Sequence, residues 1–92
     1  MKKSNEIIIA KIIGNELRIH KGYIKTKGTK TINICIEYKW TYVCERHNLE
    51  EMKEDKYTTK IYSSNVDSEK IQDELEKEFD KKLSIELRFK NN

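Results

Sequence analysis

Two cysteines and two histidines are the side chains of this chain best suited to metal binding or nucleophilic catalysis: Cys35, Cys44, His20 and His47. Their number and types would satisfy a tetrahedral zinc ion, and Cys44 and His47 have a plausible local spacing. The other spacings match no zinc-binding motif. Cys35 and Cys44 are also separated by an odd number of residues, which places them on opposite faces of one continuous strand. We therefore expect free thiols, no metal and no cofactor.

Support for catalysis is equally weak. A nucleophilic cysteine needs a depressed thiol pKa and a third group that orients its base, and the spacing supplies neither. The aspartates and glutamates gather mainly in one loop and on one helix face, where solubility explains them. Gly14, Gly22 and Gly28 stand alone, so no glycine-rich phosphate loop is present in the sequence. We expect a protein that is not an enzyme.

Basic and aromatic residues interleave in the first half of the chain, a pattern typical of surfaces that stack the bases of RNA or single-stranded DNA. Tyr23 lies among three lysines, and a second aromatic run begins at Tyr38. The pI of about 8.8 is modest for such a function. The residues that we would expect to contact nucleic acid are Arg18, Lys21, Tyr23, Lys25, Lys27, Lys30 and Lys39.

Contact with another protein is the function that we favour, through Tyr38, Trp40 and Tyr42. Tyrosine and tryptophan are enriched among the residues that dominate protein interfaces. Two placements remain open: the three side chains lie in the core beneath a helix, or they lie beyond its reach and form an exposed patch. The partner is then a different protein, which makes this chain an adaptor or inhibitor, or a second copy in a homodimer.

The segment that must position these aromatic residues is 31–45, which alternates between apolar and polar residues along its whole length. Ile32, Ile34 and Ile36 begin its apolar face, and the aromatic residues continue it. We expect one long central strand. At roughly 3.3 Å per residue it exceeds the usual strand length, so it should bend or project past its sheet.

A hairpin is expected before it, from segments 6–13 and 16–27. The dipeptide Gly14-Asn15 favours a tight type II′ turn, which sets the pairing of Ile12 with Leu17. Segment 6–13 is short and rich in β-branched residues, as expected of a strand.

Gly22 interrupts the second of these strands and predicts a bulge at that position. The extra residue would return Ile24 to the face that carries Leu17. Matching of apolar residues then places Ile24 opposite either Ile32 or Ile34.

The segment after the long strand is polar and acidic, with a loop or a single helical turn that begins at Asn48. Leu49 and Met52 are its only apolar anchors. Segment 57–63 follows as a strand, which we expect to run antiparallel to segment 31–45.

The clearest helix begins near Asp67 or Ser68, either of which is a suitable N-cap. Its apolar stripe consists of Ile71, Leu75, Phe79 and Leu83. Segment 84–90 alternates again and predicts a final strand. The fold class is therefore α+β: a mainly antiparallel sheet of four to five strands, in the order ββββαβ, with one C-terminal amphipathic helix packed on one face.

Length and composition indicate one small domain over residues 1–92, with 36% hydrophobic and 38% charged residues. No apolar run is long enough for a membrane span, and the first residues do not resemble a signal peptide, so we expect a cytoplasmic protein without a membrane partner. A chain rich in lysine and isoleucine without proline fits an AT-rich bacterial, phage or other mobile-element source.

Overall fold

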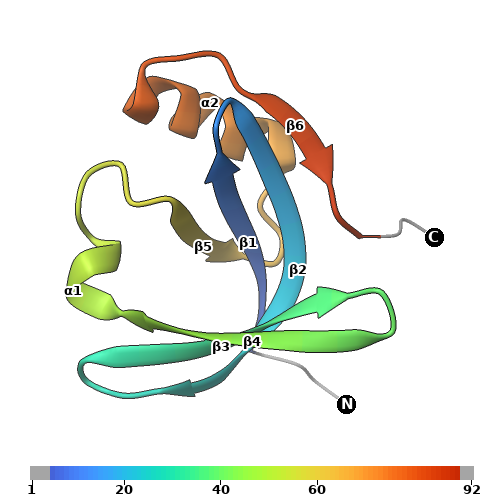
Figure 1. Ribbon diagram of the computed structural model, residues 1–92, viewed down its shortest axis with the longest axis vertical. Coiled ribbons are helices and arrows are strands. Elements are labelled where there is room, and N and C mark those ends of the chain that lie inside the picture. Colours follow the sequence, from blue (N-terminus) through green and yellow to red (C-terminus); the bar gives the residue numbers. More distant parts are fainter. Residues whose placement is uncertain (1–4, 90–92) are drawn as a thin grey trace.

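The computed structural model describes residues 5–89, and within them it contains six strands and two helices (Figure 1). The strands are β1 (Glu6–Ile13), β2 (Glu16–Lys27), β3 (Thr31–Tyr38), β4 (Thr41–Asn48), β5 (Thr59–Ser63) and β6 (Ser84–Leu87). The helices are α1 (Leu49–Met52) and α2 (Ser68–Phe79). The predicted fold class is confirmed: the protein is α+β, with a mainly antiparallel sheet and an amphipathic helix packed against it. The sheet has six strands instead of the expected four to five, because segment 31–45 forms two strands, and the short helix α1 stands before β5 in the element order.

The β1–β2 hairpin has the register that the sequence predicts. Ile12 pairs with Leu17 across the turn. Gly14 has a φ of +61°, whereas Asn15 keeps a negative φ, which is the pattern of a type II′ turn. Glycine adopts this left-handed conformation without the steric penalty that a Cβ atom would add.

β1 is the strand that is buried on both faces, and the expectation that segment 31–45 would be central is wrong. The strand order is β4-β3-β2-β1-β5, and β6 pairs with β2 outside this path. Ile7 and Ile9 face one hydrophobic core, whereas Ile8 and Ala10 face another. Because β1 has no solvated face, its apolar residues follow one another directly instead of alternating.

The expected long strand is in fact a hairpin. The chain reverses at Lys39 and Trp40, and Tyr38 pairs with Thr41. Lys39 takes the left-handed conformation that the turn needs, with a φ of +57°. The turn contains no glycine, asparagine or aspartate, the residues that usually mark such reversals, so the alternation of segment 31–45 conceals it.

The bulge in β2 does not lie at Gly22. This residue pairs regularly with Ile7 on β1 and with Ile36 on β3. The register between β2 and β3 shifts later, between Ile24 and Thr26. A glycine is required at position 22 for a different reason: the backbone of β3 approaches β2 so closely there that a Cβ atom would collide with the Cys35 carbonyl oxygen.

Ile24 lies opposite Ile34, which is one of its two expected partners. It does not return to the face of Leu17, and it packs instead against the core that contains Ile34. The physical reason is that β2 alternates without interruption between these positions, so residues an odd number apart point to opposite faces.

β5 pairs antiparallel with β1. The expectation that it would pair with segment 31–45 is therefore wrong. The short helix α1 carries the chain from the β4 edge of the sheet to the other edge, beside β1 (Figure 1). The predicted helical turn is present: Asn48 is the N-cap of α1, and its side chain accepts a hydrogen bond of 3.0 Å from the backbone N–H of Glu51. Leu49 and Met52 pack against the hydrophobic core that contains Ile32 and Ile34.

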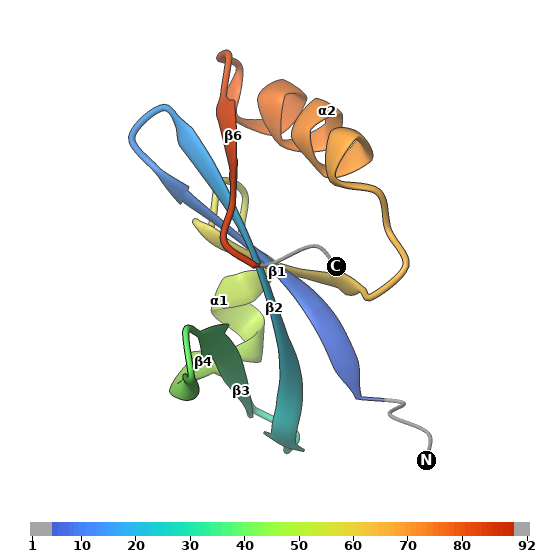
Figure 2. The same cartoon turned by 90° about the vertical axis from the view of Figure 1, so that its right-hand side faces the viewer.

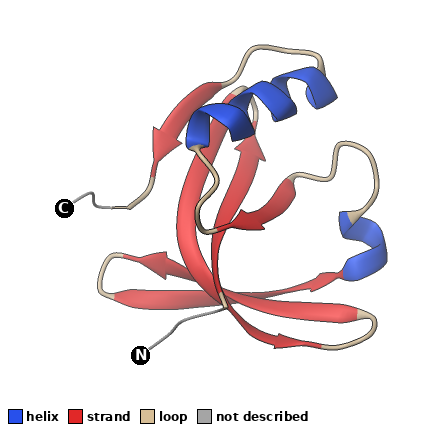
Figure 3. Ribbon diagram, turned by 180° about the vertical axis from the view of Figure 1, so that it is seen from behind, coloured by secondary structure: helices blue, strands red, loops and turns tan. Residues whose placement is uncertain are grey.

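The first hydrophobic core lies between α2 and the β1–β2 hairpin, which α2 crosses in Figure 3. Ile71 and Leu75 of α2 are fully buried there, as the apolar stripe predicts. The helix ends at Asp80, which has a φ of +55°. β6 then runs parallel to β2. Lys90, the last residue of the expected final strand, lies outside the described residues.

The second core lies on the other face of β1, where the β3–β4 hairpin folds across the sheet (Figure 2). Ile32, Ile34 and Ile36 of β3 are buried in it, which confirms their predicted core position. The two cores hold α2 and the β3–β4 hairpin at opposite ends of the molecule (Figure 1). The hairpin end is the part that the helix leaves uncovered.

Candidate protein-contact site

The β3–β4 hairpin ends in an exposed group of three aromatic residues, Tyr38, Trp40 and Tyr42, which we name the aromatic tip. Trp40 is 92% exposed, and Tyr38 and Tyr42 are 49% and 50% exposed. The sequence leaves open whether these three side chains lie in the core or on the surface, and in the structure they lie on the surface. The reason is the turn, which reverses the chain before the aromatic residues can extend the isoleucine face into the core.

The aromatic tip presents side chains on both faces of the hairpin. Tyr42 lies opposite Glu37, on the other face from Tyr38. Its ring packs edge to face against Tyr23 of β2, with the ring centroids 5.1 Å apart. On the opposite face the ammonium group of Lys39 lies 5.7 Å from the centre of the Tyr38 ring. The base of the tip is thus anchored to β2, while its end projects into solvent.

A disulfide bond between Cys35 and Cys44 joins β3 to β4 below the aromatic tip. The two residues are direct partners in the ladder, with their Cα atoms 4.0 Å apart. The expectation of free thiols is therefore wrong, because it assumed that segment 31–45 is one strand. The turn at Trp40 places both residues on the same face. By closing this loop the bond restricts the conformations that the aromatic tip can adopt.

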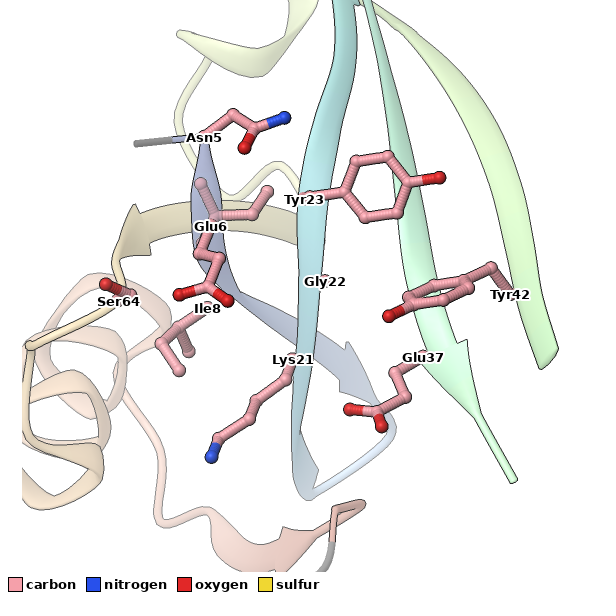
Figure 4. A pocket seen from close by; sticks show the side chains of 10 residues that line it. Asn5, Glu6, Ile8, Lys21, Gly22, Tyr23, Glu37, Tyr42 and Ser64 are labelled. Carbon is pink, nitrogen blue, oxygen red and sulfur yellow. The ribbon is translucent and has the colours of Figure 1, made fainter. Parts of the chain in front are cut away.

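A pocket of about 440 Å³ opens beside the aromatic tip. Figure 4 shows it across β1, β2, β3 and β4, on the sheet face that carries Tyr42. Among its lining residues are Glu6, Lys21, Gly22, Tyr23, Glu37 and Tyr42. Sequence reasoning missed this site because its members lie on separate strands, and only the two tyrosines carried a recognisable pattern.

The residues expected to contact nucleic acid are distributed over several surfaces. Arg18 donates a hydrogen bond of 2.8 Å to the carboxylate of Glu16. The ammonium group of Lys21 lies 4.5 Å from the centre of the Phe89 ring. Arg18 and Lys21 therefore do not belong to one continuous basic surface.

Lys25, Lys27 and Lys30 are exposed around the connection from β2 to β3. Lys39 lies at the other end of β3, a strand of 8 residues that spans about 26 Å. Tyr23 is held against Tyr42, at the wall of the pocket. The structure therefore brings three of the seven candidates together at one turn.

His47 belongs to a polar network that connects β4 to the segment after α1. Its Nε2 lies 2.9 Å from the Glu45 carboxylate, and its Nδ1 lies 2.9 Å from the Tyr57 hydroxyl. Glu45 also pairs with Lys11 of β1. Burial raises the pKa of Glu45, but the hydrogen bonds from Lys11 and His47 outweigh it and lower this pKa overall. Burial raises the pKa of Tyr57, so its hydroxyl stays protonated at neutral pH and is not an activated nucleophile.

The four residues considered for zinc do not converge. Cys35 and Cys44 are bonded to each other and cannot act as thiolate ligands while oxidised. His20 has a buried Nδ1 without a hydrogen-bond partner among residues 5–89. In that part of the chain no three histidine, cysteine, aspartate or glutamate side chains are grouped so as to hold a metal ion.

No family model, no curated protein and no solved structure matches this chain. None of the helices within residues 5–89 has the length and apolar composition needed to cross a membrane.

Proposed function

We propose that this protein is a small, non-enzymatic binding protein that contacts another protein through the aromatic tip. The observation that carries this proposal is the position of Trp40, which is 92% exposed at the end of a projecting hairpin. An exposed tryptophan with two half-exposed tyrosines beside it has the composition of an interface hot spot. Exposed Val43 on β4 adds an apolar side chain on the face of the hairpin that carries Tyr38.

The construction of the hairpin supports this function. The Cys35–Cys44 bond and the packing of Tyr42 on Tyr23 both order the tip before any partner binds. A preorganised surface loses less conformational entropy on binding, so more of the contact energy appears as affinity. Lys39 is the only charged residue between Tyr38 and Tyr42, which suits an apolar contact that depends little on salt.

The test is affinity capture of the partner from the native host, with two variants that each replace one exposed apolar side chain by alanine. Trp40→Ala should abolish capture of the partner, while circular dichroism and the denaturation midpoint stay unchanged because the side chain is exposed. Ile13→Ala removes an equally apolar, half-exposed side chain at the β1–β2 turn and should leave capture intact. Capture of the same partner by Trp40→Ala would contradict the proposal.

A second copy of this chain is one form that the partner can take. β4 is an edge strand of the sheet, and edge strands pair readily with another chain. Light scattering distinguishes the two cases. A dimer mass that falls to the monomer mass in Trp40→Ala identifies a homodimer, whereas a monomer mass in both directs the search to a different protein.

Nucleic-acid binding is the second candidate function. It is supported by the exposure of Lys25, Lys27 and Lys30 around one turn. Binding of a single-stranded oligonucleotide should then weaken steeply between about 50 and 200 mM salt, because counterions are released from the phosphates. A triple Lys→Gln variant at these positions should lose this binding, and Trp40→Ala should keep it.

The cytoplasmic location expected from the sequence remains a prediction, and the disulfide argues against it. Thiols in the cytoplasm are kept reduced, so a stable bond between Cys35 and Cys44 favours an oxidising compartment. Thiol labelling of denatured protein taken directly from its host cells measures the state of the two residues. Labelled cysteines support the cytoplasm, and unlabelled cysteines support an oxidising compartment.

A further inference from the structure

The pocket beside the aromatic tip has two carboxylates on its walls, one on each side of β2. Figure 4 shows Glu6 on β1 and Glu37 on β3, with β2 between them. Because neighbouring strands are about 4.8 Å apart, β1 and β3 are separated by about 10 Å. Lys21 and Tyr23 of β2 share this face with the two carboxylates, and the pocket volume of about 440 Å³ leaves room for one side chain of a partner.

Both carboxylates are available for a ligand. Within residues 5–89 neither Glu6 nor Glu37 forms an ion pair or a side-chain hydrogen bond. Among residues 5–89, Lys21 is the only cationic residue on the pocket wall, and its ammonium group is directed toward the ring of Phe89, 4.5 Å from the ring centre. Although the whole chain has a net charge of +3, the described part of this pocket thus carries two carboxylates against one ammonium group.

Two aromatic rings complete the wall on the side of the aromatic tip. Tyr23 and Tyr42 lie almost perpendicular to each other, at 77°, and line the pocket together. Gly22 lines the pocket with its backbone alone, because a Cβ atom at this position would point to the other face of the sheet, toward Ile9. A Cβ atom there would collide with the Cys35 carbonyl, which makes the absence of a side chain a requirement of the fold.

We propose that this pocket receives an arginine side chain of the partner protein. The inference rests on the proposed function, since Tyr42 belongs to both the aromatic tip and the pocket wall. A segment bound across the tip would thus place an apolar residue against Trp40 and an arginine between Glu6 and Glu37.

Arginine fits this chemistry better than other side chains. Its planar guanidinium group stacks on aromatic rings and presents five N–H donors, enough to reach both carboxylates. An anionic group would meet two negative charges, and an aliphatic group would leave the carboxylates without new hydrogen bonds while removing water from them. Lysine offers a compact charge without a planar surface for the tyrosine rings.

The experiment is an NMR titration of the full chain with N-acetyl-arginine methylamide and, separately, with the neutral isostere N-acetyl-citrulline methylamide. The arginine compound should shift the Gly22 amide and the ring resonances of Tyr23 and Tyr42 saturably, and the citrulline compound should not. Glu6→Gln and Glu37→Gln should each weaken arginine binding about fivefold, the effect of one solvent-accessible ion pair. Glu50→Gln, an exposed glutamate on α1, is the matched control and should have no effect.

Three results would overturn the inference: equal binding of both compounds, unchanged affinity in both glutamate variants, or the absence of saturable shifts at Gly22. The Trp40→Ala variant separates this inference from the proposed function, because it should lose the partner but still bind the arginine compound. If Trp40→Ala loses the partner and no arginine binding occurs, the aromatic tip stands and the arginine pocket is rejected. If the arginine compound binds but partner capture survives Trp40→Ala, the pocket stands as an arginine site and its role beside the tip is rejected.

Discussion

A Cβ atom added to Gly22 of β2 would lie only 2.1 Å from the carbonyl oxygen of Cys35 on β3. The same atom would lie 2.7 Å from Cδ1 of Ile9 on β1. Because one of these neighbours is backbone, it cannot rotate away. The close approach at Gly22 lets β3 fold across the sheet and bury its isoleucines against Ile9.

Gly22→Ala should therefore destabilise the protein by roughly 2 to 3 kcal/mol, the magnitude typical of an overpacked core. Gly28→Ala is the control, because its Cβ would meet only the Thr31 carbonyl at an ordinary 3.7 Å. This control should change stability by less than about 0.5 kcal/mol. Urea denaturation followed by circular dichroism measures both. Equal midpoints for the two variants would contradict the packing described for Gly22.

Reduction of the Cys35–Cys44 bond should lower the free energy of unfolding by about 2 to 3 kcal/mol, because it releases a short loop in the unfolded chain. The measurement is the denaturation midpoint with and without a thiol reductant. A Cys35→Ala/Cys44→Ala double variant should start at the lower stability and not respond to the reductant. Identical midpoints of the native chain under both conditions would show that the bond does not form or does not contribute.

His20 should make the fold less stable in mild acid. Burial is the main cause that lowers its pKa, followed by the positive charges of Lys11 and Arg88. Arg18 adds to this lowering, and only Glu45 opposes it. Since the imidazole of the unfolded chain keeps a pKa of about 6.5, the unfolded state binds more protons than the folded state below that pH. Stability should be complete above about pH 6.5 and decrease as the pH falls toward the folded-state pKa.

His20→Gln should flatten this dependence between about pH 7 and pH 5, as measured by denaturation at a series of pH values. The carboxyl groups with lowered pKa, Glu16, Glu45 and Glu78, titrate below their ordinary value of 4.5. The pKa of Glu86 is raised, mainly by its hydrogen bond with Glu16, and this shift adds stability as the pH falls, so it does not cause a loss of stability in mild acid. A variant whose stability falls as steeply as that of the native chain would refute the assignment to His20.

Lys39→Gly should stabilise the β3–β4 hairpin. Lys39 has a φ of +57°, and a side chain with a Cβ in this left-handed region costs about 1 kcal/mol, which glycine avoids. Glycine also loses more backbone entropy on folding, so the net gain should be smaller than this. Gly14→Ala is the converse test, because Gly14 has a φ of +61° and no atom within 4 Å of a new Cβ, so any loss of stability there reports backbone strain alone. A lower denaturation midpoint for Lys39→Gly would contradict the turn.

Local pattern was sufficient for much of the fold. The β1–β2 hairpin follows from Gly14-Asn15, because a two-residue turn sets the register of everything paired beyond it. The α2 helix follows from the spacing of Ile71 and Leu75, and α1 from the capping side chain of Asn48. In each case the determining interactions lie within a few residues along the chain.

The candidate site depended on a turn that local pattern concealed. Lys39 and Trp40 resemble strand residues, and only the favourable packing of both flanking strands holds Lys39 in a left-handed conformation. Because the turn is not visible in the sequence pattern, two expectations are wrong: that Cys35 and Cys44 are free thiols, and that segment 31–45 is the central strand of the sheet.

The amino-acid sequence by itself determined the α+β class, the isoleucine cores and the choice of Tyr38, Trp40 and Tyr42 as contact candidates, since these depend on composition and periodicity. Only the tertiary structure decided that the aromatic residues are exposed, that the cysteines are bonded and that Glu6 and Glu37 line one pocket. These relationships join residues on different strands, and their pairing depends on where the chain reverses. The turn at Lys39, a residue with positive φ, is therefore the reason that segment 31–45 forms a hairpin with an exposed aromatic tip instead of one long strand.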